Sequence, residues 1–281
     1  ILLLLQLGGL GVMTISVALY RWLGRSISFR QRMALQNMFA HTPREDMLGL
    51  LRSVFAFTFV AELAGALLLT IHFWRYYPFL QALHSGVFHS ISAFCNAGFS
   101  IYSDSLMPYS ASWLLNFTIC GLIVLGGLGF PVLHDLRRWY SQRHTGSARL
   151  FVQTKVVLVT TGILIVAGAC LFAFVERQSL IASSSFSHEV LVPFFQSITC
   201  RTAGFNTVDI GSLKDVTLLL MMLLMFFGAS PGSCGGGVKT TTLAILAAFT
   251  FSRVFGRKRA NLFKKSLPEE TVSRSVSLIL V

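Results

Sequence analysis

The sequence predicts an all-α protein that crosses a membrane several times and is built from repeated units. Three observations support this. The 281 residues have a mean hydropathy of +0.68, with 54% hydrophobic and 12% charged residues, which is too apolar for a water-soluble domain. The basic residues are concentrated in alternate connections between apolar segments. Two short segments, 95–100 and 200–207, share Ala-Gly-Phe at an offset of 106 residues, each after a short apolar stretch.

The apolar segments differ in length, and the length predicts which of them span a bilayer. A spanning helix needs about 20 apolar residues. Two segments of 16 and 14 residues are too short, since 16 residues reach only about 24 Å at about 1.5 Å per residue. We expect these two to be re-entrant pore helices, at 79–94 and 186–199. The predicted spans are 53–73, 112–133 and 156–175, with 1–20 as an earlier one and 215–250 as a longer one.

The order span, short helix, loop, span occurs twice. The second unit covers 21–133: a linker, span 53–73, pore helix 79–94, loop 95–99 and span 112–133. The third covers 134–250: span 156–175, pore helix 186–199, loop 200–205 and span 215–250, which Gly and Pro interrupt at 228–237. Residues 1–20 then form the second helix of a first unit, and 251–281 form a cytoplasmic linker and the start of a fourth. Because both ends lie within apolar helices, we expect a longer protein.

The formal charge of +12 reflects membrane topology rather than nucleic-acid binding. The stretches 21–52, 137–155 and 253–274 hold 18 of the 23 Lys and Arg residues. Basic loops face the cytoplasm in membrane proteins. We therefore expect loops 21–52, 134–155 and 253–274 to be cytoplasmic and the Ala-Gly-Phe loops to face outward. A nucleic-acid binder would place its charge on a folded polar face, and the sequence has no such domain.

The chemistry of the two loops predicts a cation path. Their side chains do not suit a transition metal, but their carbonyl oxygens can replace the hydration shell of a large monovalent cation, and Gly permits the backbone angles required. We expect Phe99 and Phe205 to wedge the loops from behind. The predicted ion-binding residues, the selectivity filter, are Cys95, Asn96, Ala97, Gly98, Thr202, Ala203 and Gly204. No nucleophile, phosphate loop or metal-ligand spacing appears, so no enzymatic activity, cofactor or metal other than K⁺ is expected.

The interruption in span 215–250 predicts a loop inside the membrane. Each Gly costs about 1 kcal/mol and Pro about 3 kcal/mol in a helix, which favours a flexible segment over a continuous span. We interpret this segment as a gate. The alternative is a simple kink with Lys239 reaching to the cytoplasmic surface. The residues assigned to the gate are Gly228, Ser230, Pro231, Gly232, Gly235, Gly236, Gly237 and Lys239.

Two longer motifs carry a resemblance to a known family. They are Ser-Ile-Thr-Cys-Arg-Thr-Ala-Gly-Phe-Asn-Thr at 197–207 and Gly-Ser-Cys-Gly-Gly-Gly-Val-Lys-Thr-Thr-Thr at 232–242. The whole chain resembles the ion-translocating subunits of the Trk/Ktr/HKT superfamily of K⁺ transporters. The resemblance implies four K⁺-channel-like M1–P–M2 units around a pseudo-fourfold pore, with filter glycines at Gly98 and Gly204. It also implies a gating loop at 228–238 and K⁺ uptake across the bacterial inner membrane.

The same resemblance implies partners and leaves alternatives open. It suggests a homodimer in the lipid membrane with a cytoplasmic RCK-type regulatory subunit. ATP or NAD would bind that subunit and not this chain. Na⁺ or H⁺ coupling stays open. The alternatives are a K⁺-binding subunit of a P-type ATPase complex, a Na⁺-permeable or cation-coupled relative, and a carrier for organic solutes. The last would need inverted repeats, whereas these units run in the same direction.

Four polar residues in apolar surroundings need partners. Glu62 lies within a span, where a carboxylate is costly. Arg or backbone amides are its expected partners, although a role in ion passage stays open. We expect Arg201 to face away from the pore and brace its loop. Asn116 and His72 are expected to form hydrogen bonds between helices.

Overall fold

The computed structural model describes residues 1–10, 47–143, 149–177, 185–256, 261–263, 265–266 and 268–280. The second half of predicted helix 1–20 and most of the predicted linker 21–52 lie outside these residues. Within the described part the chain is helical, apart from one two-stranded hairpin. The first helix, α1, covers Leu2–Leu10.

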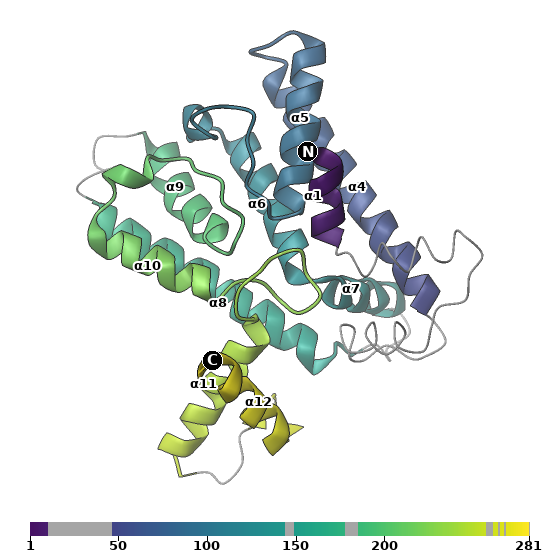
Figure 1. Cartoon of the computed structure of the whole chain (residues 1–281), viewed down its shortest axis with the longest axis vertical. Helices are drawn as coiled ribbons and strands as arrows, with labels where there is room; N and C mark the ends of the chain where they lie inside the picture. Colours follow the sequence, from purple (N-terminus) through teal and green to yellow (C-terminus); the bar gives the residue numbers. More distant parts are fainter. Residues whose placement is uncertain are drawn as a thin grey trace.

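The second unit forms three packed helices, as predicted. They are α4 (Met47–Phe73), α5 (Phe79–Phe94) and α6 (Trp113–Leu128). Pro78 precedes α5, and Ser112 caps α6 by accepting a hydrogen bond from Leu115 N. The short helix α5 packs between α4 and α6 (Figure 1). The segment before α6 includes the single turn η1 (Met107–Tyr109).

The third unit repeats this arrangement with a broken last helix. Its first two helices are α8 (Val152–Glu176) and α9 (Phe186–Thr199). The turn η4 (Ile210–Ser212) leads to α10 (Asp215–Phe226), which a loop separates from α11 (Thr240–Val254). Figure 1 shows α9 and α10 on the opposite side of the molecule from α4 and α5. The short helices predicted at 79–94 and 186–199 are both present with those bounds, and their role as pore helices stays a prediction.

Each pore helix also packs against a helix of the preceding unit. Helix α5 contacts α1, and α9 contacts α6. Helix α11 lies against α8 and against the last helix, α12 (Glu269–Leu280). Between α11 and α12 in sequence lies a short antiparallel hairpin of β1 (Asn261–Leu262) and β2 (Lys265–Ser266). The same packing step thus occurs twice along the chain.

The predicted span 112–133 is wrong at its C-terminal end. Helix α6 stops at Leu128, and after Gly129 the chain continues as α7 (Phe130–Gln142) at an angle of 98°. Gly129 has φ 87°, a backbone angle that favours glycine. Pro131 lies in the first turn of α7, where its missing N–H is not needed. The sequence Gly-Phe-Pro therefore ends one helix and starts another.

Two helices in the described part are long and apolar enough to cross a bilayer. They are Ser53–Phe73, within α4, and α8, and the bent pair α6 and α7 adds a third if it counts as one span. Helices α10 and α11 are apolar but shorter. The chain is therefore a polytopic helical membrane protein with a broken helix in its third unit.

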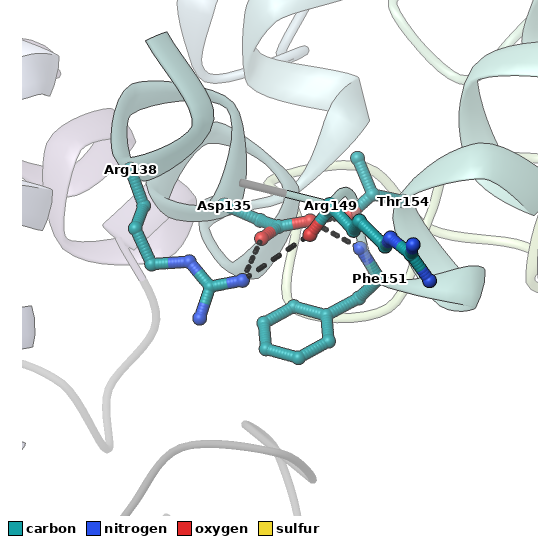
Figure 2. Close-up of polar contacts among 5 residues, drawn as sticks. All are labelled: Asp135, Arg138, Arg149, Phe151 and Thr154. Atoms are coloured by element: carbon teal, nitrogen blue, oxygen red, sulfur yellow. Dashed lines mark hydrogen bonds and ion pairs between the residues drawn. The ribbon is translucent and has the colours of Figure 1, made fainter. Parts of the chain in front are cut away.

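Asp135 joins α7 to the start of α8. Its carboxylate is buried and accepts hydrogen bonds from Phe151 N at 2.9 Å and Thr154 Oγ1 at 2.7 Å. Arg138 forms an ion pair with it at 3.2 Å and also lies over the Phe151 ring, 4.3 Å from its centroid (Figure 2). The same guanidinium donates to Arg149 O at 3.4 Å. Asp135 therefore supplies the N-terminal cap of α8 from a different helix.

Replacing Asp135 with alanine should lower the stability of the protein by about 2–3 kcal/mol, because two buried donors lose their acceptor. We expect a smaller loss for Asp135→Asn, which keeps one acceptor oxygen. Thermal unfolding of the purified protein in detergent measures both. Glu270→Ala is the control, since the Glu270–Arg274 pair is exposed and should contribute little. A melting temperature of Asp135→Ala equal to that of the unmodified protein would contradict the capping role.

Candidate functional site

The two Ala-Gly-Phe loops lie against each other. A Cβ atom added at Gly98 would collide with the Ala203 carbonyl oxygen and lie 2.8 Å from the Gly204 Cα. Farther along the two segments, Leu106 N donates a hydrogen bond to Asn206 O at 3.0 Å. Segments separated by 106 residues in sequence are thus direct neighbours. This juxtaposition is what a shared ion path requires.

The backbone conformation of the first loop is repeated in the second. Asn96 and Thr202 have φ 50° and 68°, and Gly98 and Gly204 have φ 69° and 90°. Positive φ is uncommon for residues other than Gly, and for a β-branched residue such as Thr it is an outlier. Strained angles of this kind are concentrated at functional sites. The same two positions have positive φ in both loops, so the loops share one backbone conformation there.

Three carbonyl oxygens in each loop accept no hydrogen bond from the part of the chain that the structure describes: those of Asn96, Ala97 and Gly98, and those of Thr202, Ala203 and Gly204. The next carbonyl is bonded in both loops. Ser92 Oγ donates to Phe99 O at 2.8 Å, and Thr199 Oγ1 donates to Phe205 O at 2.9 Å. Most buried carbonyls in proteins are paired. These six oxygens are therefore free to bind a cation.

Side chains of the short helices α5 and α9 hold the C-terminal end of each Ala-Gly-Phe loop. His89 Nε2 and Ser100 Oγ are 2.9 Å apart, and Gln196 Nε2 donates to Thr207 Oγ1 at 3.2 Å. Both pairs join residues 11 positions apart. The pore helices also direct their C-terminal ends, which are partially negative, at the loops. The two loops are thus braced in the same way.

A tyrosine cluster supports the segment that follows the first loop. Tyr102 donates to Ser85 Oγ on α5 at 3.1 Å, and the hydroxyls of Tyr77 and Tyr109 are 3.0 Å apart. Burial raises the pKa of the Tyr102 hydroxyl above its ordinary value, so it stays a neutral donor. The segment 100–112 is therefore anchored to α5 and to the turn between α4 and α5.

Residues 227–239 form a compact loop between α10 and α11. Ala229 N donates to Gly236 O at 3.0 Å, and Val238 N donates to Phe226 O at 3.0 Å, which closes the base of the loop. Within it, Lys239 Nζ donates to Gly235 O at 3.0 Å. The expected interruption is confirmed as a break between two helices. The loop has more hydrogen bonds than a simple flexible segment would have.

This loop contacts the second Ala-Gly-Phe loop directly. Gly236 N donates to Thr202 Oγ1 at 3.1 Å. A Cβ added at Gly235 would lie 2.8 Å from the same hydroxyl oxygen and 3.0 Å from the Asn96 amide. The side chain of Lys239 is half-buried and points back into the loop instead of away from it. The predicted filter and gate residues are therefore adjacent in space.

Residues 2–280 match the family model for TrkH, described as a cation transport protein. The chain belongs to the TrkH family of cation transport proteins. This confirms the resemblance predicted from the two motifs. It also confirms that the chain is a transport protein and not an enzyme.

The TrkH family includes relatives with closely matching sequences. The chain is 35% identical to the Ktr system potassium uptake protein B of Vibrio alginolyticus, and the match covers 99% of this chain and 61% of the relative. It is 32% identical to the protein of the same name in Bacillus subtilis, and this match covers 98% of this chain and 61% of the relative. It is 31% identical to the potassium/sodium uptake protein NtpJ of Enterococcus hirae, over 100% of this chain and 61% of the relative. The chain thus spans about three-fifths of the length of these relatives.

A solved TrkH-family structure has the same fold. The crystal structure of the potassium transporter TrkH from Vibrio parahaemolyticus superposes with a TM-score of 0.67 at 17% identity. The match covers 99% of this chain and 55% of that one. The helical polytopic fold predicted from the sequence is therefore confirmed.

In this TrkH-family chain, Arg201 has the bracing contacts expected of it. Its guanidinium is buried and donates to Thr161 Oγ1 on α8 at 3.3 Å and to Gly228 O at 3.5 Å. It has no carboxylate partner among the described residues. A buried cation without an acid is costly. It ties the second Ala-Gly-Phe loop to both α8 and the beginning of loop 227–239.

The expected partner of Glu62 is wrong. The buried carboxylate accepts a hydrogen bond from the Gln6 side chain of α1 at 3.1 Å instead of contacting Arg or backbone amides. Cys95 Sγ lies 4.0 Å from its other oxygen. Sequence reasoning could not pair residues 6 and 62, because no local pattern places α1 beside α4. Glu62 therefore lies next to Cys95 at the start of the first Ala-Gly-Phe loop.

Two further expectations are corrected. Phe205 is fully buried behind its loop, but Phe99 is 56% exposed and does not wedge the first loop. Asn116 donates to the backbone carbonyls of residues 109, 110 and 112 just before its own helix, so it does not join two helices. His72 does reach another element, since its Nδ1 lies 3.3 Å from Ser112 Oγ at the start of α6.

Proposed function

We propose that the protein takes up K⁺ through a selectivity filter made of backbone carbonyl oxygens. The filter residues in this chain are Cys95, Asn96, Ala97, Gly98, Thr202, Ala203 and Gly204. The observation that carries the proposal is a set of six carbonyl oxygens, in two touching loops of similar backbone conformation, that accept no hydrogen bond from the described residues. Carbonyls of this kind replace the hydration shell of an alkali cation. The names of the relatives, which are potassium uptake proteins, support K⁺ as that cation.

We infer that the loops belong to quasi-equivalent units around one axis. In support, α1 packs on α5 as α6 packs on α9, so each unit contacts the next in the same way. The described residues contain two such units, together with α1 from the unit before them and α12 from the start of the unit after them. Four such units around an axis would close a ring with pseudo-fourfold symmetry. The filters would face outward and the basic loops 21–52, 134–155 and 253–274 the cytoplasm.

We also propose that loop 227–239 is the gate of this path. It lies against Thr202 of the filter and is held by hydrogen bonds and by the packing of Ala229 and Cys234, without a metal site or an ion pair among the described residues. Hydrogen bonds of this kind can be exchanged for water when the loop moves. Lys239 lies within it and adds a positive charge that opposes cation passage in the closed state.

The family supports proposals about partners and location. We propose a homodimer in the inner membrane of a bacterium, controlled by a cytoplasmic RCK-type subunit that binds the nucleotide. The basic connections of this chain would face that subunit. Na⁺ or H⁺ would be the coupling ion, if one is used.

Complementation of a bacterium that lacks its own K⁺ uptake tests the proposal. The full-length protein should restore growth at low K⁺ and catalyse ⁸⁶Rb⁺ uptake, whereas the empty vector should not. Competition of the uptake by Na⁺ distinguishes a K⁺-selective protein from a potassium/sodium transporter like the NtpJ relative. Uptake only with a copurifying ATPase subunit would favour the pump alternative. No uptake with either ion would contradict the function.

A further inference from the structure

The end of α6 and the beginning of α7 lack partners of their own. The last four carbonyls of a helix and the first four N–H groups of the next have no partner within their helix. Helix α6 ends at Leu128 and α7 begins at Phe130, with only Gly129 between them. The break therefore leaves several backbone carbonyl and N–H groups without a helical hydrogen-bond partner at one place. We call residues 126–130 the α6–α7 corner.

Loop 227–239 supplies the missing partners. Cys234 N donates to Gly126 O at 3.1 Å, and Ser230 N donates to Gly127 O at 3.0 Å. In the opposite direction, Phe130 N donates to Gly232 O at 2.9 Å. The loop thus caps both helices at once, although it lies about 100 residues farther along the chain. No side chain takes part in these three bonds.

The glycines of the corner make this close approach possible. A Cβ at Gly129 would lie 2.5 Å from Pro231 O, and one at Gly126 would collide with Phe94 O. Gly129 also has φ 87°, and Gly232 opposite it has φ 68°. Gly129 therefore lets loop 227–239 approach the corner, whereas Gly126 lets the same part of α6 approach the end of α5.

We propose that the α6–α7 corner is the latch that holds loop 227–239 in its position under the filter. Gly129 and the Phe130 N–H act as positioning groups: they do not contact the ion but keep the loop closed. Movement of the loop would require the three backbone bonds to break and water to replace them. The inference rests on the proposed gating function, since it identifies what keeps the gate shut.

The latch predicts that Gly129→Ala releases the loop, because the added methyl group collides with Pro231 O and the positive φ becomes strained. Two quantities measure the release in the full-length protein. One is the rate at which a membrane-permeant maleimide labels Cys234, which is half-buried in the loop, in a Cys170→Ser background. The other is K⁺ flux in proteoliposomes. Both should rise roughly fivefold, the factor that corresponds to one net hydrogen bond.

Gly121→Ala is the matched control, because Gly121 lies on the same helix with no atom within 4 Å of an added Cβ. It should leave labelling and flux unchanged. A second pair of variants, at Phe130, isolates the hydrogen bond from Phe130 N to Gly232 O. Phe130→Pro removes the N–H that donates to Gly232 O at a position where helices accept proline, whereas Phe130→Ala removes the same ring and keeps the N–H. Labelling and flux should be higher for Phe130→Pro than for Phe130→Ala.

The outcomes separate the latch from the transport proposal. Equal labelling within both pairs would overturn the latch, and so would faster labelling without added flux. If the unmodified protein carries no K⁺, the transport proposal fails, while the labelling rates still decide whether the corner holds the loop. If Gly129→Ala does not fold, the Phe130 pair decides alone, since its two members lose the same buried ring.

Discussion

Gly98→Ala should abolish K⁺ uptake, and Gly204→Ala should impair it less. Both residues have positive φ, where a side chain costs about 1–2 kcal/mol. At Gly98 a second penalty is added, since the new Cβ would collide with Ala203 O and lie 2.8 Å from the Gly204 backbone. At Gly204 the nearest atom to an added Cβ is the Gly98 Cα at 3.5 Å, an ordinary contact. The same substitution thus has different effects at two equivalent positions.

The measurement is ⁸⁶Rb⁺ uptake with and without competing Na⁺, in a strain without its own K⁺ uptake. We expect a loss of at least about 100-fold for Gly98→Ala, and for Gly204→Ala roughly the 5- to 30-fold loss that 1–2 kcal/mol produces, with weaker discrimination against Na⁺. Gly121→Ala and Gly162→Ala are controls, because both glycines are helical with open space around them. Uptake by Gly98→Ala at the unmodified rate, with normal membrane insertion, would exclude this loop from the filter.

The sequence predicted the elements that segment length determines. The helices at 79–94 and 186–199 have the predicted bounds, because apolar segments of 16 and 14 residues between polar loops leave little choice. The repetition of Ala-Gly-Phe also predicted that the two loops adopt one conformation. The angles at Asn96 and Thr202 agree with this, and at Thr202 the residue type gives no sign of it, because a β-branched residue rarely adopts positive φ.

Features that depend on contacts distant in sequence were not predictable. The break after Leu128 was missed because the hydropathy continues through Phe130, and only the Gly-Phe-Pro sequence signalled it. Phe99 and Phe205 follow identical motifs, yet one is exposed and the other buried, because their neighbours differ. The Gln6–Glu62 pair joins two units, and no local pattern reports which side chains meet between units.

Loop 227–239 combines a feature that the local sequence predicted with one that depends on contacts distant in sequence. Its interruption of a long apolar segment was visible in the glycine and proline content. The groups that bind the loop were not visible in the sequence, because they are backbone groups of another unit, those of Gly126, Gly127 and Phe130. Backbone groups carry no sequence signature except the glycines that let the chains approach.

Deleting residues 230–236 should raise K⁺ flux more than any single substitution in the loop. The deletion joins Ala229 to Gly237, and these ends are already close, because Ala229 N bonds Gly236 O at 3.0 Å. The bond between Val238 N and Phe226 O at the base can stay intact, so α10 and α11 remain connected. All three bonds to the α6–α7 corner and the contact with Thr202 are lost. The space under the filter is then open.

The test compares this deletion with Lys239→Met in proteoliposomes. Lys239→Met keeps the loop but removes its charge and the bond to Gly235 O, so its flux should lie between those of the unmodified protein and the deletion. Discrimination between K⁺ and Na⁺ should be the same in all three, because the carbonyls of 96–98 and 202–204 are untouched. Equal flux would mean that loop 227–239 is not a gate. Higher flux without selectivity would mean that the deletion damages the filter. In that case the hydrogen bond from Gly236 N to Thr202 Oγ1 supports the filter backbone as well as the loop.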